Sequence, residues 1–471
     1  MSNIEELRRQ VVGVDVQVPT LDGEERPYIN FDNAASTPVL KPVLEGVDEF
    51  MRWYASVHRG TGFKSKLSTL AYETAREKVL DFVGADRDRR VAIFVRNTTE
   101  AVNKLAHRLG LTRGDVVVTT LLEHHSNDLP WRRVADVRRL PTTSEGRPEL
   151  DALDSLLSEL GNRVKLVALT GASNVTGLVT PIHDVARVAH RHGVPVFVDA
   201  AQLAPHRKIS LEGDGRVDTY IDYLGFSAHK MYAPYGSGAL VGWRELFEDG
   251  EPTEVGGGTI RIVTLEDVVW ATPPENEEAG SPNVPGAVAL GLAIDWFERV
   301  GMETVEAHEH DLAVYAWNRL HEVPGVEFYG PPLTEEANDR LGVFVFNLKG
   351  WHHAKLAAVL GYEFGIGVRN GCFCAHPYVK HLLDIRGDKE RDLVQKVSRG
   401  DWTDIPGAVR ISFGFYNTRD EVDALVEALQ AIRAGQSQAD RYRLIPHTGE
   451  YVPENDLDFR RFLPRLDLAG N

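Results

Sequence analysis

The middle of the chain alternates short apolar runs with amphipathic segments, and this alternation constrains the fold more than any other feature. Strand-like apolar runs occupy residues 91–95, 116–118, 166–169, 194–198 and 223–226. Between them, apolar residues recur at helical spacing from Thr99 to Leu109 and from Ile182 to Ala189. Parallel strands need crossover connections, which are usually helices. The pattern therefore predicts an α/β fold with a mainly parallel sheet sandwiched by helices.

A second, smaller α+β region is expected after the sheet. Helical stretches cover 287–299 and 303–320, strand-like runs follow at 342–346 and 409–413, and a last amphipathic helix stops near Gly435. The predicted division is an N-terminal arm at 1–27, a large domain at 28–290, a small domain that carries both cysteines at 291–435, and a polar tail at 436–471. No role is assigned to the tail.

The composition limits the partners that we expect. Of 471 residues, 43% are hydrophobic and 26% are charged, as in ordinary globular enzymes. The formal net charge of −17 argues against a nucleic-acid partner. No apolar run approaches the ~18 residues needed to span a bilayer, and the N-terminal segment lacks a signal-peptide core. We expect a cytoplasmic protein with neither a nucleic-acid nor a membrane partner.

Two polar residues follow neighbouring strand-like runs and have complementary chemistry. Asp199 ends the run at 194–198, and Lys230 comes shortly after the run at 223–226. In open α/β sheets, ligands bind at the carboxyl ends of the strands. A lysine there can bond covalently to an aldehyde, and an aspartate can keep a pyridine nitrogen protonated. Together the two residues predict a site for pyridoxal 5′-phosphate (PLP).

Other residues can complete such a site. Residues 97–100 lie between a strand and a helix, where backbone N–H groups and hydroxyls bind phosphate. An ordinary helix N-cap would look the same, but Asp199 and Lys230 favour the phosphate interpretation. Ser227 and His229 flank the lysine as further donors. His124 is expected to stack on the pyridine ring and to move protons, although adjacent histidines in loops are often solvated.

The chain has only two cysteines, Cys372 and Cys374, so it has no disulfide framework. A zinc site would need a second pair of ligands nearby, and a disulfide across one residue would be strained. Either these are two unreactive cysteines or one is a reactive thiol in a glycine-led loop, and spacing alone slightly favours the first. We expect no metal. The histidines at 308–310 are assigned to a surface helix, and His352 and His353 to a solvated turn.

The motifs, taken in order, resemble the class V, fold-type I PLP enzymes, and within them the group II cysteine desulfurases and selenocysteine lyases. The resemblance covers about residues 28–435. The matching segments are 31–35, 57–60, 98–101, 123–125, 173–177, 199–202, 227–230, 280–283, 369–377, 410–412 and 416–418. It implies a mainly parallel seven-stranded sheet, a smaller α+β domain, bound PLP and a homodimer.

The resemblance also implies a role for each matching residue. Lys230 would carry PLP, Asp199 would pair with its ring nitrogen, and Gln202 would bond its ring hydroxyl. His124 would stack on the ring. The residues implied to hold the phosphate are Thr98, Thr99, Ser227, His229 and, from the other subunit, Ser281. Those implied to bind the substrate carboxylate are Asn174, which also contacts the cofactor, Arg369 and Arg410, for which a bidentate arginine is apt.

Cys374 falls where this family keeps its sulfur-accepting cysteine. The implied reaction converts L-cysteine to L-alanine. The Lys230 amine removes the Cα proton, and the Cys374 thiolate takes the sulfur as a persulfide for transfer to an acceptor, for which a protein is one candidate. His376 or Arg369 is expected to help Cys374 ionise. Catalysis is thus assigned to Lys230, Cys374 and His124.

The chain departs from the family pattern around this cysteine. Cys372 and Phe373 stand where two histidines are usual, and His376 replaces a glutamine. The Gly-Cys-Phe-Cys order looks more like the desulfurase domain of molybdenum cofactor sulfurases, which widens the range of acceptors. The stretch 378–407 is longer than usual. A surface insertion is the favoured interpretation, and a lid or docking surface is the alternative.

Two other functions stay open. One is another class V reaction, that of a C–S lyase, a selenocysteine lyase, an epimerase or a biosynthetic enzyme, in which Cys374 is not essential. The other is a sulfur-carrier or scaffold protein without catalysis. The intact Asp199, Gln202 and Lys230 argue against the second.

Overall fold

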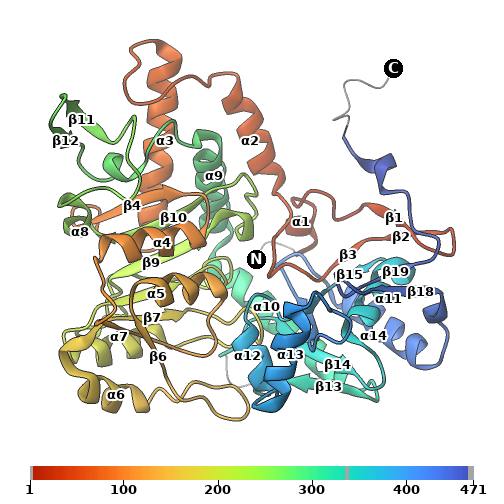
Figure 1. Ribbon diagram of the computed structural model, residues 1–471. Helices are drawn as coiled ribbons and strands as arrows, with labels where there is room; N and C mark the ends of the chain where they lie inside the picture. Colours follow the sequence, from red (N-terminus) through yellow and green to blue (C-terminus); the bar gives the residue numbers. More distant parts are fainter. Residues whose placement is uncertain (1–3, 335–338, 465–471) are drawn as a thin grey trace.

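A seven-stranded sheet forms the centre of the protein (Figure 1), in a computed structural model that describes residues 4–334 and 339–464. Its strands, in spatial order, are β4 (Arg90–Val95), β10 (Gly238–Trp243), β9 (Tyr223–Ser227), β8 (Val196–Asp199), β7 (Val164–Thr170), β5 (Val116–Thr119) and β6 (Asp136–Arg139). Only β10 runs antiparallel to its neighbours. The predicted α/β fold with a mainly parallel sheet is confirmed. The strands β6 and β10 were not predicted.

Helices cover both faces of this sheet. Successive residues of a strand point to opposite faces, so Val91, Ile93 and Val95 join one core cluster and Ala92 joins another. The first cluster is covered by α4 (Thr98–Arg108), α5 (Leu129–Val134) and α8 (Arg244–Glu248). The second is covered by α2 (Lys41–Met51), α3 (Phe63–Phe82), α6 (Ala152–Leu160), α7 (Ile182–Arg191) and α9 (Val284–Val300).

A smaller antiparallel sheet lies beside the first. Its order is β13 (Val326–Tyr329), β14 (Val343–Leu348), β17 (Ala408–Ser412) and β16 (Arg369–Gly371). It shares a core with α10 (Met302–His321), α11 (His353–Phe364) and α14 (Arg419–Arg433). Thr418 and Glu421 form a capping box at the start of α14, and Gly435, with φ of +73°, follows its end. The domain boundaries stay a prediction.

The N-terminal residues pack on both units. The elements here are α1 (Ile4–Arg8), β1 (Gln17–Pro19), β2 (Glu25–Pro27) and β3 (Ile29–Asn30). Leu7 joins the core of the large sheet, whereas Ile29 and Phe31 join that of the small sheet. β3 pairs in parallel with β15 (Ile366–Gly367). This crossing segment thereby ties the two sheets together.

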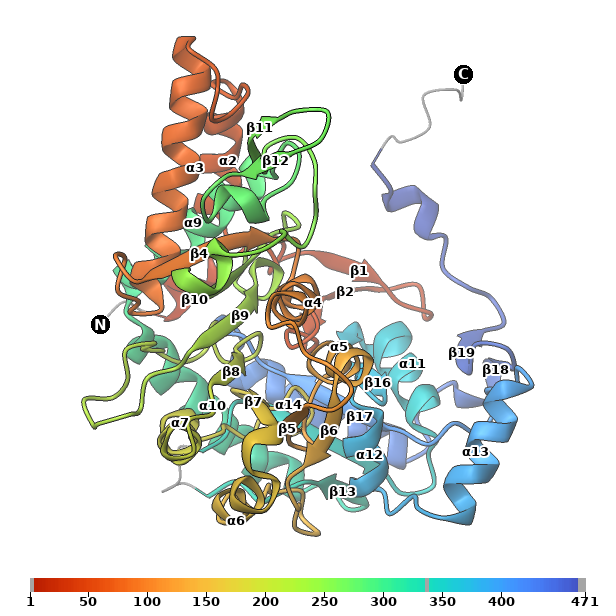
Figure 2. The ribbon, with the colours of Figure 1, turned by 60° about the vertical axis from the view of Figure 1, so that its left-hand side comes forward.

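The long stretch 378–407 and the C-terminal tail lie side by side. The stretch begins within α12 (His376–Leu382) and includes the exposed α13 (Asp388–Ser398), and the tail folds into the hairpin of β18 (Tyr442–Ile445) and β19 (Glu450–Pro453). The Trp402 N–H donates to the Pro446 carbonyl at 2.9 Å. Tyr442 is buried in the core of the small sheet. Beyond the hairpin, the chain leads away from the body (Figure 2).

Two sequence predictions about polar residues are wrong. His353 does not lie in a solvated turn, because it is buried as the first residue of α11 and its Nε2 lies 2.9 Å from the Ile405 carbonyl oxygen. The helix at 308–310 is not wholly on the surface, because Glu309 is buried against His206. Within residues 4–334 and 339–464, no helix is both long and apolar enough to cross a membrane.

Candidate active site

A cavity of about 380 Å³ opens at the carboxyl ends of the parallel strands, facing the small sheet. Residues that follow β4, β5, β8 and β9 form its wall on one side, and β16, β17 and the cysteine loop form the other. All predicted site residues except Ser281 line it, namely Thr98, Thr99, His124, Asn174, Asp199, Gln202, Ser227, His229, Lys230, Arg369, Cys374 and Arg410. The tertiary structure therefore brings together segments that are far apart in the sequence.

Lys230 and Asp199 form the chemical centre of this cavity. Lys230 ends the 3₁₀ turn η3 (Ala228–Lys230) that follows β9. Burial lowers the pKa of its amine to about 8, although the charge of Asp199 opposes the shift. Asp199 is 3% exposed, and burial raises its pKa while an N–H from Ala201, 3.0 Å from Oδ1, counteracts the rise. A lysine of this kind is partly unprotonated near neutral pH and so can act as a nucleophile.

His124 lines the same cavity as this pair and lies just before the turn η1 (His125–Asn127). Its Nδ1 accepts a hydrogen bond from the Ser126 N–H at 3.1 Å. Burial, together with the charge of Lys230, lowers the pKa of the imidazole to about 3. The ring is therefore neutral at physiological pH. A neutral imidazole can stack on an aromatic ring. It is less suited to the proton transfer near neutral pH that the sequence suggested.

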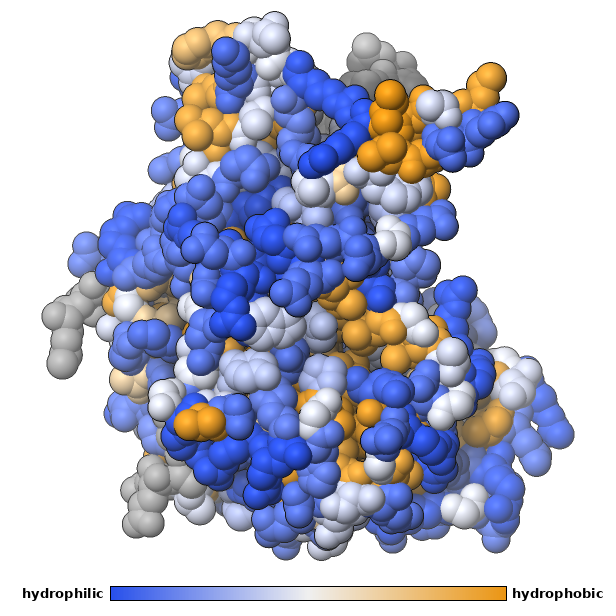
Figure 3. All heavy atoms as spheres, turned by 90° about the vertical axis from the view of Figure 1, so that its left-hand side faces the viewer, coloured by the Kyte–Doolittle hydropathy of each residue, from blue (hydrophilic) through white to orange (hydrophobic). Residues whose placement is uncertain are grey.

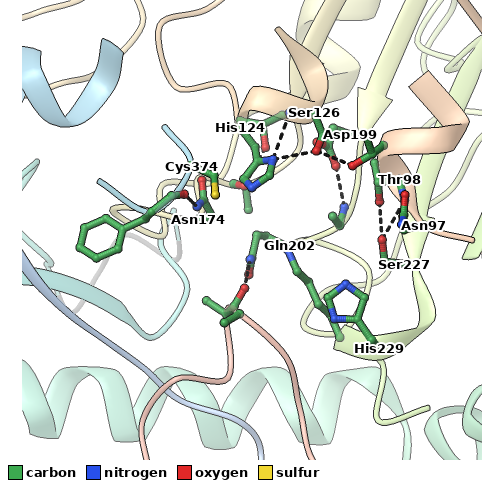
Figure 4. Close-up of a pocket in the computed structure, with 18 of the residues that line it drawn as sticks. Asn97, Thr98, His124, Ser126, Asn174, Asp199, Gln202, Ser227, His229 and Cys374 are labelled. Atoms are coloured by element: carbon green, nitrogen blue, oxygen red, sulfur yellow. Dashed lines mark hydrogen bonds between the residues drawn. The ribbon is translucent and has the colours of Figure 1, made fainter. Parts of the chain in front are cut away.

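Hydroxyls and a helix N-terminus gather at the opposite end of the cavity (Figure 4). Asn97 caps α4 by accepting the Glu100 N–H. The Ser227 hydroxyl accepts the Thr98 N–H at 2.8 Å and lies 2.8 Å from the Thr98 hydroxyl. Thr99 Oγ1 is 2.7 Å from Ser126 Oγ. Donors of this kind at a helix start suit a phosphate.

Gln202 is fixed at the cavity wall between these two ends. Its Nε2 donates to the Ala34 carbonyl at 2.6 Å, and the side chain is buried. His229 lies below it in Figure 4. Burial, and the charge of Lys230, lower the His229 pKa to about 4, so this imidazole also stays neutral and can donate a hydrogen bond from one nitrogen.

Arg410 and Asn174 form the wall nearest the small sheet. Arg410 is 2% exposed; its Nη1 donates to the Asn174 carbonyl at 3.0 Å and its Nη2 to Asp32 at 2.7 Å. Its buried Nε has no hydrogen-bond partner among the described residues. A buried donor without a partner is costly, so this group fits a ligand such as a carboxylate. Asp32 was not predicted as a site residue. The only sequence signal for it was a carboxylate within the segment 31–35, which matches the family.

The cysteine loop completes the cavity wall. Cys374 is exposed, whereas Cys372 is half-buried and donates to the Pro406 carbonyl at 3.3 Å. Burial raises the pKa of the Cys372 thiol to about 11. The Asn174 side-chain amide donates to the Phe373 carbonyl at 2.7 Å. Asn174 therefore links the carboxylate-binding end of the cavity to the loop that holds Cys374, and the two cysteines differ sharply in their surroundings.

Ser281 lies outside the cavity. It lies just before α9 and lines a separate depression with Glu278 and Gly280. A role for it in the phosphate site would require a second copy of the chain, and that assignment stays a prediction.

The donor set of the cavity fits PLP. A phosphorylated pyridine aldehyde needs an amine for its aldehyde, a carboxylate for its ring nitrogen and donors for its phosphate, and an amino acid needs a cation for its carboxylate. The cavity offers the buried amine with a lowered pKa, the buried carboxylate, the helix start and the arginine with an unpaired Nε. Lys230, Asp199 and Thr98 would hold the cofactor. Among the described residues, no three side chains of the metal-binding types are grouped to hold a metal ion.

Comparisons with known proteins agree with this geometry. The family model for class-V aminotransferases matches residues 29–425. A probable cysteine desulfurase of Halalkalibacterium halodurans is 38% identical over 423 residues, which are 88% of this chain and 95% of the relative. A cysteine desulfurase of Haloferax volcanii is 35% identical and covers 90% of this chain and 93% of its own.

A comparison with solved structures also finds similarity to a cysteine desulfurase. The apo structure of a cysteine desulfurase from Thermococcus onnurineus is 34% identical, with a TM-score of 0.75 over 87% of this chain and 95% of the other. The two chains therefore share one fold over most of their length. The chain therefore belongs to the class-V aminotransferase family, within its group of cysteine desulfurase relatives.

Proposed function

We propose that this protein is a PLP-dependent cysteine desulfurase, which converts L-cysteine to L-alanine and transfers the sulfur through a persulfide on Cys374. One observation carries the proposal: the exposed Cys374 lines the same cavity as Lys230 and Arg410. A nucleophilic thiol, a proton-accepting amine and a carboxylate-binding guanidinium thus face one substrate-sized space. The names of the relatives support the same activity.

Different residues of the cavity would bind the cofactor and the substrate carboxylate. Lys230 would hold the cofactor covalently and Asp199 would lie against its ring nitrogen, with His124 and Gln202 beside the ring. When bound, PLP supplies an electron sink for the carbon next to the substrate carboxylate. Arg410 would orient that carboxylate, because it lines the cavity and its Nε has no hydrogen-bond partner among the described residues. Lys230 lines the same cavity and would be the base for the proton on that carbon.

Proton and sulfur transfer then fall to two side chains. The Lys230 amine, freed when the substrate amino group takes its place, would take the Cα proton and later return a proton to Cα. Cys374 Sγ attacks the substrate sulfur, so that an S–S bond forms as the C–S bond breaks. The electron pair of the C–S bond and a proton go to the carbon that becomes the alanine methyl group. An acceptor thiol then attacks the outer sulfur of the Cys374 persulfide, and the exposure of Cys374 leaves room for a protein acceptor.

A homodimer is part of the proposal. The hairpin of β11 (Ile260–Val263) and β12 (Val268–Trp270) projects from the body and gives the apolar patch at the upper right of Figure 3. Its exposed apolar residues are Ile262, Val263, Leu265, Val268 and Val269. Patches of this kind mark interfaces. We expect light scattering to give twice the chain mass, and Val269→Asp to lower that mass. A cytoplasmic location stays a prediction.

The test of the activity is a comparison of two cysteine variants. The PLP-loaded protein is supplied with L-cysteine, and alanine and sulfide are measured. We expect Cys374→Ala to lower alanine formation by at least about 100-fold, and Cys372→Ala, the matched control, to keep most of it. Undiminished alanine formation by Cys374→Ala would contradict the persulfide step. A PLP-loaded wild-type protein that makes no alanine would favour another class V reaction.

A further inference from the structure

The tip of the β11–β12 hairpin is an exposed apolar side chain beside two negative charges. Leu265 is fully exposed in the turn between the strands, and the next two residues, Glu266 and Asp267, are exposed as well. Neither carboxylate forms an ion pair with any residue of 4–334 or 339–464. Exposed apolar groups rimmed by polar ones mark interaction sites, so this tip is suited to a partner surface.

An apolar groove of about 530 Å³ lies between the C-terminal tail and the body. Tyr28 and Tyr362 line it from the body, and Leu457 and Phe462 line it from the tail. Gly361 of α11 also lines it, and the nearest atom outside its own helix would be 4.0 Å from an added Cβ. Glycine within a helix is destabilising, and here its missing side chain leaves the groove deeper.

Two arginines border this groove. Arg460 and Arg461 are exposed in η6 (Phe459–Phe462), the turn of the tail that lines it. Among the described residues neither has an ion-pair partner, and the neighbouring Asp458 caps the turn by accepting the Arg460 N–H at 3.2 Å. The hairpin tip therefore offers an apolar side chain and two negative charges, whereas the groove offers apolar walls and two positive charges.

The hairpin lies apart from the groove of its own chain. Figures 1 and 2 show the hairpin and the tail rising on the same, upper side of the molecule, with the hairpin on the left and the tail on the right. A twofold rotation about an axis between them exchanges the two positions. The hairpin of one copy then faces the tail of the other, and the same contact forms twice in a closed dimer.

We infer that the hairpin tip of each copy docks in the groove beside the C-terminal tail of the other copy, with Leu265 between the apolar walls and Glu266 and Asp267 against Arg460 and Arg461. This inference rests on the homodimer of the proposed function and adds to it the surface that receives the hairpin. It also gives a role to the end of the tail, and it is independent of the reaction in the cavity.

Charge reversal in the full-length, PLP-loaded protein tests this contact. The tip variant combines Glu266→Arg with Asp267→Arg, and the tail variant combines Arg460→Glu with Arg461→Glu. Each places like charges at both contacts of its own dimer. We expect the dimer dissociation constant of each, measured by analytical ultracentrifugation, to rise at least about tenfold. The matched control reverses two exposed charges of α13, Asp388→Arg with Asp392→Arg, and should keep the wild-type constant.

The two variants together distinguish a contact between copies from one within a chain. In a mixed dimer, the reversed tip of one copy faces the reversed tail of the other, and the two unreversed surfaces face each other, so both contacts are again attractive. We expect the tip and tail variants, expressed together with different affinity tags, to form mostly mixed dimers. Random pairing of the two, or a monomeric wild type, would overturn the inference.

The apolar part of the contact has its own test. Leu265→Asp should raise the dissociation constant at least about tenfold, whereas Val217→Asp, which changes a valine that is 80% exposed on another loop, should leave it unchanged. Equal constants in these two variants would reject the docking of Leu265. None of these measurements uses cysteine. A wild type that makes no alanine would therefore refute the proposed activity without affecting this result.

Discussion

The imidazole rings of His125 and His376 stack in parallel beside Cys374, with centroids 4.9 Å apart and 5° between their planes. The His376 N–H donates to His125 Nε2 at 3.2 Å, and the His125 N–H donates to the Cys374 carbonyl at 2.8 Å. Phe373 and Cys374 have φ values of +52° and +54°, which cost energy for residues other than glycine. The histidine pair thus holds a strained loop in place.

Removing one ring of this pair should loosen the loop. We expect His376→Ala to speed hydrogen exchange of the amides around Cys374 by about tenfold, because the ring stack and the 3.1 Å contact between His376 Nδ1 and His125 Nε2 are lost. His376 is exposed, so the stability of the whole protein should change little. The exposed His447 is the matched control, and His447→Ala should leave this exchange unchanged. Equal exchange in both variants would contradict a clamping role.

The two cysteines should differ strongly in reactivity. Cys374 is exposed, whereas Cys372 is half-buried and its thiol has a pKa of about 11. At pH 8, only about one in a thousand Cys372 thiols is ionised, and the thiolate is the reactive form. We expect iodoacetamide to modify Cys374 at least about tenfold faster. Timed quenching followed by peptide mass spectrometry measures both rates, and comparable rates would refute the prediction.

Incorporation of PLP should follow the ionisation of Lys230. Burial lowers the pKa of this amine from 10.5 to about 8, and only the unprotonated amine attacks an aldehyde. The rate at which the apo protein takes up PLP, trapped by borohydride, should therefore rise with pH and reach half its maximum near pH 8. Lys208→Ala removes an exposed lysine and should show the same midpoint. A midpoint near 10.5 would mean that the amine is not desolvated.

The C-terminal hairpin should stabilise the small sheet. Tyr442 is 8% exposed and packs into its core, whereas Phe459, further along the tail, is 57% exposed. We expect Tyr442→Ala to lower the free energy of unfolding by about 3 kcal/mol, and Phe459→Ala to change it by no more than about 0.5 kcal/mol. Urea denaturation of the apo protein gives both values. Equal effects would show that the tail does not contribute to this core.

Acid should weaken the fold through His353. Burial lowers its pKa from 6.5 to about 4, so the folded state keeps this ring neutral. Its stabilising contribution is complete above about pH 6.5 and is lost as the pH falls toward 4, because the unfolded chain then binds a proton that the folded chain does not. Between pH 7 and pH 5, protonation of His353 in the unfolded chain should lower the free energy of unfolding by about 2 kcal/mol. His353→Asn should reduce the difference in unfolding free energy between pH 7 and pH 5, and an unchanged difference would contradict the prediction.

Much of the site could be predicted from local sequence. Asp199 and Lys230 each follow an apolar run that is buried as a strand, and the carboxyl ends of parallel strands meet at one edge of a sheet. That reasoning needs only the order of residues along the chain. The strand β10 was missed because it runs against its neighbours, and its pairing with β4 and β9 depends on segments far apart in sequence.

The sequence by itself determined the alternation of strands and helices, the mainly parallel sheet and the pairing of Lys230 with Asp199, because hydrophobic periodicity and residue chemistry are local properties. Only the tertiary structure decided that Asp32 bridges Arg410 and Arg369, that His376 stacks on His125, and that His353 is buried. Each of these depends on which distant side chain lies within a few ångströms and on how much water is excluded there. Those quantities arise from packing, and a linear pattern does not contain them.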